Sequence, residues 1–414
     1  MEIRQMNAEI VSRSVNITAV APPSKSASQR LILAAALKKG VTLIKNVGGA
    51  DDISAMTGCL SSLGAKITRS GGDLVVEGIK TLPEKVVLDC KESGATYRFL
   101  IPVVAASGVN ATFTGSGKLL SRPLGNLVNE LEKHGETVNG NTFFGRISSG
   151  EYVIDASVTS QTASGLLFAL PLVRGFSSLC FTEKPVSEKY LDMTYSVLDL
   201  SGIKYEKSGY KTIIVGKQSY SLPDTVRVCG DWSAAAFLLV IGTICGCASV
   251  SGLSFSDGQG DKAIVDILRR MNADIAVKGD KVEVRRSQLK GIKLNCEDIP
   301  DLVMPLVAAA VFADGESEFT GIERLKYKES DRLESLTGLM KACGAKYETD
   351  GKTLKVYGKT YTRGGAVFDG KNDHRVVMAA TAIALGVGGK SVVSNAESVK
   401  KSYPDFFGAL GIEI

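Results

Sequence analysis

Three short segments of the chain combine cations with acids or hydroxyls within a few residues. Ser24–Arg30 reads SKSASQR, Lys328–Arg332 reads KESDR, and Asn372–Arg375 reads NDHR. Arg and Lys bind phosphate and carboxylate groups, and a carboxylate beside them can accept and return a proton. These segments therefore predict group transfer between anionic substrates, in which positioning and electrostatics dominate.

Further cations stand in turns between the expected elements. Arg122 lies in SRPLG and Lys401 lies in KKSYP. Of the two histidines, His374 lies in NDHR and is a candidate site residue, with a structural role as the alternative. His134, in EKHGE, is interpreted as an exposed residue at the end of a helix.

The composition is that of an ordinary globular chain. The 414 residues carry a net charge of +5, which is too balanced for a dedicated nucleic-acid binder but suits small anionic substrates. The eight cysteines lack zinc-ligand spacing, so we expect no metal and a reducing, cytoplasmic location. An uncharged run over residues 233–250 is predicted to be a buried helix and strand rather than a membrane span.

The elements that position these residues recur six times along the chain. In one signature an amphipathic helix ends before a strand, at Gly64, Gly135, Gly202, Asn272, Gly344 and Gly411. A second signature, with the same period, is a strand, a polar turn and an Ala-rich helix that is apolar nearly all round. Each repeat thus reads as strand, buried helix, strand, surface helix and a two-stranded hairpin.

The last repeat has no hairpin, whereas residues 1–20 contain strand-like segments that no helix precedes. We expect this N-terminal segment to supply strands to the last repeat, which places both termini in one domain. The predicted α/β chain has one domain of residues 1–20 plus 229–414 and an inserted domain of residues 21–228, each with three repeats. The chain crosses twice, near Ala21 and Cys229, and we expect the active site in the cleft between the domains.

In each repeat the polar turn stands at the N-terminus of the buried helix, where N–H groups favour anions. Three such ends could converge in each domain. Ordinary capping is the alternative for Ser24, Ser93, Ser157, Asp231 and Asp298. Capping does not account for Lys25, Arg30, Arg98 or Arg375, because the helix dipole disfavours cations there. KESDR could also be a solvated helix start with i,i+3 ion pairs.

Taken together, the motifs resemble those of the 5-enolpyruvylshikimate-3-phosphate synthase family, the 3-phosphoshikimate 1-carboxyvinyltransferases. SKSASQR, SRPLG, SVTSQ, VSEKYLDMT, IPD, KESDR, NDHR and KKSYPDFF follow the family's order through essentially the whole chain. The resemblance implies a two-domain inside-out α/β barrel of six βαβαββ repeats. It also implies transfer of the enolpyruvyl group of phosphoenolpyruvate to the 5-hydroxyl of shikimate 3-phosphate, through a tetrahedral ketal that loses phosphate, in the shikimate pathway.

The resemblance implies a role for each matching residue. It also implies a monomeric protein that needs no cofactor and binds neither a membrane nor nucleic acid. The implied catalytic residues are Lys25, Asp301 as proton acceptor and Glu329 as proton shuttle. The residues implied to bind shikimate 3-phosphate are Lys25, Ser26, Arg30, Thr159, Ser160, Gln161, Ser187, Tyr190, Asp301 and Lys328. Those implied to bind phosphoenolpyruvate are Lys25, Gly94, Arg122, Gln161, Arg332, His374, Arg375 and Lys401.

The chain departs from the family at Glu92–Phe99, which reads ESGATYRF instead of Asn-Ala-Gly-Thr-Ala-x-Arg-Pro, and at Arg324, where Asn is frequent. An alternative acceptor is UDP-N-acetylglucosamine, the substrate of a sister enolpyruvyl transferase. That enzyme usually carries a Cys in a mobile loop near the Arg122 region, and Phe113–Gly125 contains no Cys. RNA 3′-phosphate chemistry would need a catalytic His and a nucleotide site. A binding module without catalysis would need neither Asp301 nor Glu329.

Overall fold

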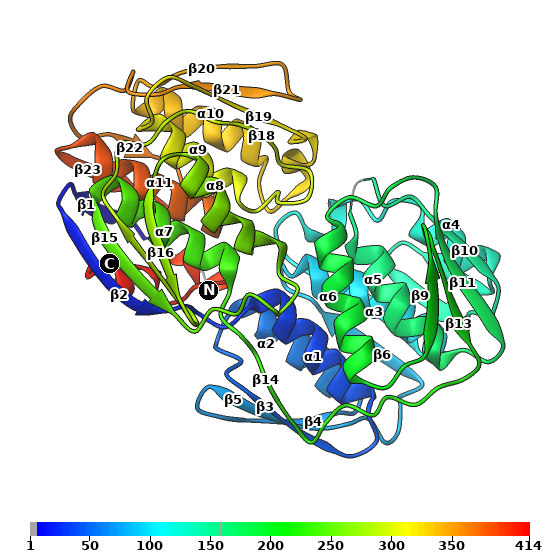
Figure 1. Ribbon diagram of the computed structural model, residues 1–414. Coiled ribbons are helices and arrows are strands. Elements are labelled where there is room, and N and C mark those ends of the chain that lie inside the picture. The colour runs from blue at the N-terminus through cyan, green and yellow to red at the C-terminus, as the bar shows by residue number, and fades with distance from the viewer. Residues whose placement is uncertain (1–5, 158) are drawn as a thin grey trace. The chain divides into compact units, whose positions relative to one another are not determined.

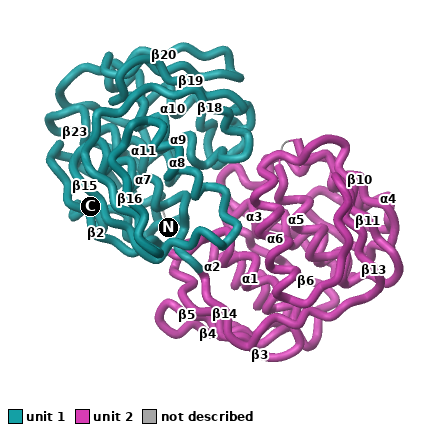
Figure 2. The backbone as a smooth tube through the Cα atoms, in the orientation of Figure 1, with its two compact units in different colours: residues 1–22, 229–414 teal, residues 23–228 magenta. Residues whose placement is uncertain are grey.

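The computed structural model describes residues 6–157 and 159–414, and the chain divides into two compact units (Figure 1 and Figure 2). Unit 1 comprises the described residues up to Pro22 together with Cys229–Ile414, and unit 2 comprises Pro23–Val228. Each unit has a hydrophobic core of its own. The chain therefore leaves unit 1 once, completes unit 2, and returns.

Each unit contains three small sheets with parallel and antiparallel strands. The sheets of unit 2 are, in strand order, β14 (Thr225–Arg227), β3 (Val41–Lys45), β5 (Asp73–Glu77) and β4 (Lys66–Ser70); β6 (Lys85–Asp89), β7 (Asn110–Thr114), β9 (Thr142–Gly145) and β8 (Glu136–Asn139); and β10 (Glu151–Ile154), β11 (Phe176–Phe181), β13 (Lys211–Val215) and β12 (Tyr205–Ser208). The sheets of unit 1 are β16 (Asp274–Lys278), β17 (Lys281–Arg285), β15 (Gly246–Ser251) and β2 (Val15–Val20); β18 (Lys293–Asn295), β19 (Glu316–Thr320), β21 (Leu354–Tyr357) and β20 (Lys346–Thr349); and β1 (Ala8–Val11), β23 (Lys390–Val393) and β22 (Val367–Phe368). In all five four-stranded sheets a parallel pair is joined by an antiparallel hairpin.

The strands β2 and β14 each pair within one unit and continue into the first helix of the other. β2 runs into the first helix of unit 2, yet it pairs in parallel with β15 of unit 1, with Val15 opposite Gly246 (Figure 1). β14 runs into the first helix that follows in unit 1, yet it pairs in parallel with β3 of unit 2. The expectation that the N-terminal segment serves the last repeat was wrong for β2, because its alternating pattern fits another open sheet edge equally well. It was correct for β1, which pairs antiparallel with β23.

Six largely buried helices form the interiors of the units. They are α1 (Lys25–Leu37), α3 (Gly94–Ser107) and α5 (Gln161–Ala169) in unit 2, and α7 (Trp232–Cys245), α9 (Val303–Val311) and α11 (His374–Val387) in unit 1. Every residue of α7 and α9 is buried, and the uncharged run over 233–250 forms α7 followed by β15, as predicted. Within the described chain, no helix has both the length and the apolar character that crossing a membrane requires.

The other described helices alternate with these along the chain and keep one face exposed. They are α2 (Asp51–Ser62), α4 (Leu127–Lys133), α6 (Glu188–Leu200), α8 (Ile264–Arg270), α10 (Arg332–Ala342) and α12 (Phe406–Ala409), with 3-10 turns η1 (Leu119–Ser121), η2 (Leu170–Leu172), η3 (Gly260–Ala263), η4 (Glu323–Tyr327) and η5 (Ala396–Lys401). In α2, for example, Ile53, Met56 and Leu60 are buried at the spacing of one helical face, whereas Asp51 and Ser54 are exposed.

Candidate active site

Polar side chains cap the N-termini of four buried helices by accepting hydrogen bonds from backbone N–H groups. The capping residues are Ser24 of α1, Ser93 of α3, Asp231 of α7 and Asp373 of α11. Ser157 and Asp298 do not cap, because α5 begins at Gln161 and α9 begins at Val303. Capping thus accounts for several of the hydroxyls and carboxylates, but not for the cations beside them.

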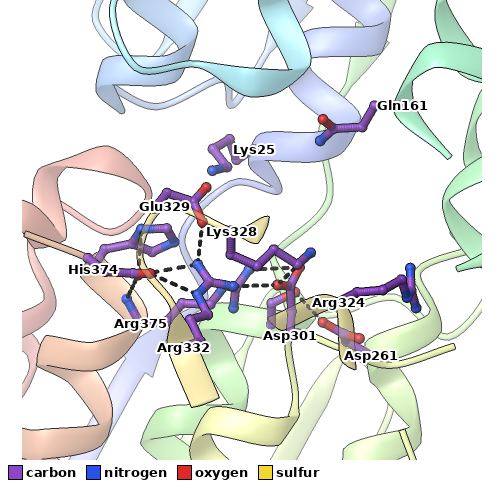
Figure 3. A network of polar contacts seen from close by, with 12 residues as sticks. Lys25, Gln161, Asp261, Asp301, Arg324, Lys328, Glu329, Arg332, His374 and Arg375 are labelled. Atoms are coloured by element: carbon purple, nitrogen blue, oxygen red, sulfur yellow. Dashed lines mark hydrogen bonds and ion pairs between the residues drawn. The ribbon is translucent and has the colours of Figure 1, made fainter. Parts of the chain in front are cut away.

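In unit 1, the guanidinium of Arg332 binds three carboxylates (Figure 3). Nη1 donates to Asp301 Oδ1 at 3.0 Å, and Nη2 donates to Glu329 Oε2 at 2.7 Å. Nε donates to Asp373 Oδ2 at 2.9 Å. Burial disfavours the charge of a side chain that is 1% exposed, but the three carboxylates outweigh burial and raise the pKa of Arg332. KESDR is therefore not a solvated helix start.

Asp373 is fully buried and connects NDHR to this network. Its carboxylate accepts from Arg332 and also from Ser330 Oγ at 3.0 Å. Burial opposes ionisation, but the charge of Arg332 prevails and lowers the pKa of Asp373 to about 2. The ring of His374, with 1% of its side chain exposed, lies with Nδ1 3.6 Å from Asp373 Oδ1.

Asp301 lies two residues before α9 and contacts two further cations. Its Oδ2 is 3.3 Å from Arg375 Nη2, and its Oδ1 is 3.8 Å from Lys328 Nζ. Burial lowers the pKa of Lys328 to about 8, although the charge of Asp301 acts in the opposite direction. The carboxylate of Asp301 is 12% exposed, so it is accessible from outside the network.

Asp261, in η3, interacts with the charges of Asp301 and Arg375 but was not among the predicted site residues. It accepts a short hydrogen bond from Ser233 Oγ at the start of α7. Burial raises the pKa of Asp261 to about 7, and the nearby charge of Asp301 adds to the effect. Its signal in the sequence was its place in the turn before a surface helix, the position that Arg122 and KESDR occupy in other repeats.

Two more cations of unit 1 are held by backbone carbonyls. Lys401 Nζ donates to the carbonyl oxygen of Asn372 at 2.7 Å, which links KKSYP to NDHR. Arg324 donates to the carbonyl oxygen of Glu297, and burial lowers the pKa of Arg324. This bond thus links Arg324 of η4 to the loop that precedes α9.

In unit 2, Lys25 is the first residue of α1 and forms an ion pair with α2. Its Nζ lies 2.9 Å from Asp52 Oδ2, with side chains 14% and 12% exposed. Residue spacing provides no reason to select Asp52, because acids in the first turn of a helix are stabilised by the helix dipole alone. The pair holds the Lys25 ammonium in place at the start of α1.

Arg30 lies one turn further along α1 and is 2% exposed. Its Nε donates to Thr194 Oγ1 at 2.8 Å, and Nη2 donates to the carbonyl oxygen of Tyr190 at 3.0 Å. Its Nη1 donates to the carbonyl oxygen of Ser26 at 2.8 Å. Burial lowers the pKa of Arg30 to about 10. Arg30 thus joins α1 to α6, and its role as a substrate ligand stays a prediction.

The starts of α3 and α5 are joined by Arg98. Its Nη1 donates to Gln161 Oε1 at 2.9 Å, and its Nη2 donates to the carbonyl oxygen of Pro123 at 2.8 Å. A Cβ on Gly94 would lie 2.8 Å from Nη1 of both Arg98 and Arg122. The glycine therefore allows two guanidinium groups to lie against the first turn of α3, a reason that the sequence did not reveal.

The hydroxyls expected to bind a phosphate group flank α5 and α6. Thr159 Oγ1 accepts from the backbone N of Gln161 at 3.2 Å, and Ser160 is 4% exposed. Ser187, also 4% exposed, has a left-handed φ of 53° at the start of α6. Its carbonyl oxygen accepts from the backbone N of Tyr190 at 2.9 Å. Strained positions of this kind cluster at ligand-binding sites.

The predicted residues thus fall into two clusters, one in each unit. The unit 1 cluster contains Asp301, Lys328, Glu329, Arg332, His374, Arg375 and Lys401, and the unit 2 cluster contains Lys25, Ser26, Arg30, Gly94, Arg122, Thr159, Ser160, Gln161, Ser187 and Tyr190. In unit 2, a side chain at the start of α1 bonds to the start of α3, and one of α3 bonds to the start of α5. In unit 1, Arg375 at the start of α11 contacts Asp301 before α9, and Ser233 at the start of α7 bonds to Asp261 in η3. Across the described ranges, no three His, Cys, Asp or Glu side chains are grouped to hold a metal ion.

Comparison with known proteins identifies the family. The model of the family described as EPSP synthase (3-phosphoshikimate 1-carboxyvinyltransferase) matches residues 11–410. The chain belongs to this family. Its relatives in the EPSP synthase family include the 3-phosphoshikimate 1-carboxyvinyltransferase of Clostridium kluyveri, 38% identical over 95% of this chain and 94% of the relative. The Halobacterium salinarum enzyme of the same name is 32% identical over 98% of both chains.

Solved structures share the EPSP synthase fold. EPSP synthase from Acinetobacter baumannii superposes with a TM-score of 0.82 over 99% of both chains, at 22% identity. The enolpyruvyl transferase NikO from Streptomyces tendae gives a TM-score of 0.78 at 16% identity over 99% of this chain and 98% of its own. Both establish an α/β fold with mixed sheets, and the second shows that this fold also occurs in a transferase with another name.

Proposed function

We propose that this protein is a 3-phosphoshikimate 1-carboxyvinyltransferase of the shikimate pathway. It transfers the enolpyruvyl group of phosphoenolpyruvate to the 5-hydroxyl of shikimate 3-phosphate and releases phosphate. The observation that carries the proposal is the near-full-length match to relatives of that name, at up to 38% identity over 95% of the chain. The two clusters supply the cations and carboxylates that two anionic substrates and a proton transfer require.

The same proposal includes the finer architecture, an inside-out barrel of six βαβαββ repeats with three in each unit. The recurring strand order of the sheets and the alternation of buried and surface helices support it. We further propose that the substrates bind in a cleft between the units and contact both clusters at once. Closure of the units around the substrates would then exclude water from the reaction.

In unit 2 we assign the hydroxyls of Thr159, Ser160 and Ser187 to the 3-phosphate of shikimate 3-phosphate. The backbone N–H groups at the start of α5 add donors there, because a helix N-terminus favours anions. Tyr190 packs on the ring, and Gln161 lies near both ligands. Arg30 and Ser26 complete this part, with Arg30 also holding the α6 backbone through its bond to Tyr190.

We assign the phosphate and carboxylate of phosphoenolpyruvate to cations of both clusters. These residues are Lys25, Arg122, Arg332, His374, Arg375 and Lys401, with Gly94 giving room at the start of α3. Four N–H groups of Arg332 already bond to carboxylates, so we add a second role for Arg332. It holds Asp301 and Glu329 at fixed positions, which lowers the entropy cost of reaching the transition state.

The reaction proceeds by addition and then elimination. The 5-oxygen bonds to C2 of phosphoenolpyruvate while its proton passes to Asp301 and C3 gains a proton, which gives the tetrahedral ketal. In the second step C3 loses a proton and the C2–O bond to phosphate breaks. Glu329 carries the C3 proton in both directions, and Lys25 and Lys328 stabilise the charges that develop. Asp261 acts through Ser233 and the charge that it presents to Asp301.

The test is phosphate release from phosphoenolpyruvate, measured with shikimate 3-phosphate and, separately, with UDP-N-acetylglucosamine as the acceptor. We expect release with shikimate 3-phosphate, together with a product that mass spectrometry identifies as its 5-enolpyruvyl ether. Release with the UDP-sugar alone would assign the sister activity. The absence of release with both acceptors would overturn the proposal.

Asp301→Asn tests the proton acceptor. Loss of general base catalysis should lower kcat by about 10²–10⁴-fold, because an amide cannot accept the proton. Asp274→Asn is the matched control, since this aspartate is exposed on β16, and we expect wild-type kcat. Circular dichroism and urea unfolding should show both variants folded. A kcat within threefold of wild type in folded Asp301→Asn would remove Asp301 from the mechanism.

A further inference from the structure

Unit 2 contains a cavity of about 730 Å³ at the carboxyl-terminal ends of α1 and α3. Leu37, the last residue of α1, and Val103, Val104 and Ser107 of α3 line it. The volume is within the range of small-molecule pockets. The predicted ligands Lys25 and Gly94 lie at the opposite ends of the same two helices, so the cavity, here called the α1–α3 pocket, is separate from the candidate active site.

The floor of the α1–α3 pocket is apolar because the helix ends are already hydrogen-bonded. The carbonyl oxygen of Ala36 accepts from Ile79 N at 2.8 Å, and that of Ala105 accepts from Ile147 N at 3.1 Å. The carbonyl oxygen of Ser107 accepts from Arg146 Nη2 at 2.6 Å. Aliphatic side chains rather than open carbonyl groups therefore face the pocket, which favours a ligand with an apolar body.

Three cations and no carboxylate line the α1–α3 pocket among the described residues: Arg146, Arg174 and Lys217. Gly216 N donates to the carbonyl oxygen of Gly175 at 2.9 Å and extends the pairing of β11 with β13. Arg174 and Lys217, the next residue on each side, therefore both lie at this end of the β11–β13 pair and line the pocket. Cations that line one pocket repel one another and attract an anion.

No carboxylate in the described chain compensates this repulsion, because neither Arg174 nor Lys217 lies within 4.0 Å of one. The helix dipole explains the presence of a cation at Arg146, because Arg146 donates to a carbonyl oxygen at the end of α3. It does not explain Lys217, which follows a strand. An anionic group beside the exposed pair would remove the repulsion. The charge and the apolar floor together define an amphipathic anion as the complementary ligand.

We propose that the α1–α3 pocket binds a small amphipathic carboxylate. The apolar body lies on the ends of α1 and α3, and the carboxylate lies between Arg174 and Lys217. This site is independent of the enolpyruvyl transfer proposed above.

The test compares 2-naphthoate with 2-naphthamide, which has nearly the same shape but no charge, by titration calorimetry on the full chain. We expect 2-naphthoate to bind about threefold to tenfold more tightly, as two partly exposed ion pairs allow. The variant Arg174→Ala/Lys217→Ala should lose this preference and still bind both probes. Both residues are exposed, so the variant should fold.

The matched control is Arg69→Ala/Arg227→Ala, which removes two exposed cations of unit 2 that do not line the pocket. The control should keep the preference for 2-naphthoate. Three results would overturn the proposal: no saturable binding of 2-naphthoate, equal affinities for the two probes in the unmodified chain, or a preference that survives Arg174→Ala/Lys217→Ala. Displacement of 2-naphthoate by excess phosphoenolpyruvate would also overturn it, because the probe would then occupy the candidate active site.

Discussion

Buried charges in this protein are stabilised to very different degrees. Arg332 is surrounded by three carboxylates, which compensate the loss of water around its charge. Glu136 in β8 is 4% exposed, and neither of its carboxylate oxygens has a hydrogen-bond partner in the part of the chain that the structure describes. Burial accordingly raises the pKa of Glu136 to about 7. The charge of Arg332 should therefore not destabilise the fold at neutral pH, whereas ionisation of Glu136 should.

Glu136→Gln should change how stability depends on pH. Above pH 4.5 the unfolded chain loses the proton of Glu136, whereas the folded chain keeps it until about pH 7. The folded state then binds more protons, so the free energy of unfolding falls as pH rises through this window. Glutamine does not titrate, so the fall between pH 5 and pH 8 should shrink by about 1–3 kcal/mol.

Urea unfolding at the two pH values measures this difference. Glu132→Gln is the control, because Glu132 is exposed on the neighbouring helix α4 and should leave the pH dependence unchanged. An unaltered pH dependence in Glu136→Gln would mean that Glu136 is already ionised in the folded protein.

Lys328 predicts a limit to activity at alkaline pH. With a pKa of about 8, its ammonium loses a proton in the range where most lysines remain charged. If the charge stabilises the bound substrate, kcat/KM should fall as pH rises through about 8, because this parameter reports groups of the free enzyme. Lys328→Arg should move the fall upward by at least about one pH unit, since arginine stays charged.

The measurement is kcat/KM between pH 6.5 and pH 10. Lys326→Arg, at an exposed position in the 3-10 turn that Lys328 follows, should behave like the unmodified protein. A fall at the same pH in all three proteins would assign the alkaline limit to another group.

At this scale the sequence predicted the cations of the site better than their acidic partners. Lys25 and Arg332 stand in dense polar runs that are hard to explain otherwise. Their partners Asp52 and Asp373 lie at helix starts, where an acid is expected on local grounds. Which acid meets which cation depends on how helices pack, and residue spacing along one chain does not encode that contact.

At the scale of elements, the start of α3 depends on the absence of a side chain at Gly94. Gly94→Ala would place a Cβ 2.8 Å from Nη1 of both Arg98 and Arg122. The guanidinium groups are flexible enough to move aside, so the protein should fold. Their displacement should raise the KM for phosphoenolpyruvate by about tenfold or more, because small misplacements of binding groups are costly.

Gly58→Ala is the matched control for this prediction. Gly58 lies inside α2, and an added Cβ would meet no atom within 4 Å. The KM should stay unchanged, and the free energy of unfolding should rise by about 0.5–1 kcal/mol, since alanine favours the helix. Equal KM values in both variants would show that Gly94 is not required for substrate binding.

The elements themselves were largely predictable, because the pattern of apolar residues distinguishes the buried helices from the amphipathic ones. The sheet that β2 and β14 each join was not. Both are short strands of alternating character that precede an apolar helix, and either fits the edge of several sheets. The sheet that each strand joins within its unit depends on how the repeats pack, which is a property of the assembled fold.

At the scale of the whole molecule, unit 2 is one continuous segment and should fold alone. Residues 23–228 include β14, which completes the sheet of β3, β4 and β5. We expect this fragment to show a cooperative urea transition and near-ultraviolet circular dichroism. A fragment of residues 23–222 lacks β14 and should be less stable. Failure of the longer fragment to fold would show that unit 2 requires unit 1.

Unit 1, in contrast, is assembled from chain ends that are made at different times. The backbone N of Met6 donates to Glu397 across 391 residues, and β2 meets β15 with Ser251 Oγ bonded to Ala19 O across 232 residues. At about 5–20 residues per second, the ribosome delivers β15 roughly 10–50 s after β2. During that interval unit 2 can finish folding, while an alternating strand waits with its edge unpaired. The first 22 residues are therefore where a nascent chain would most need a chaperone.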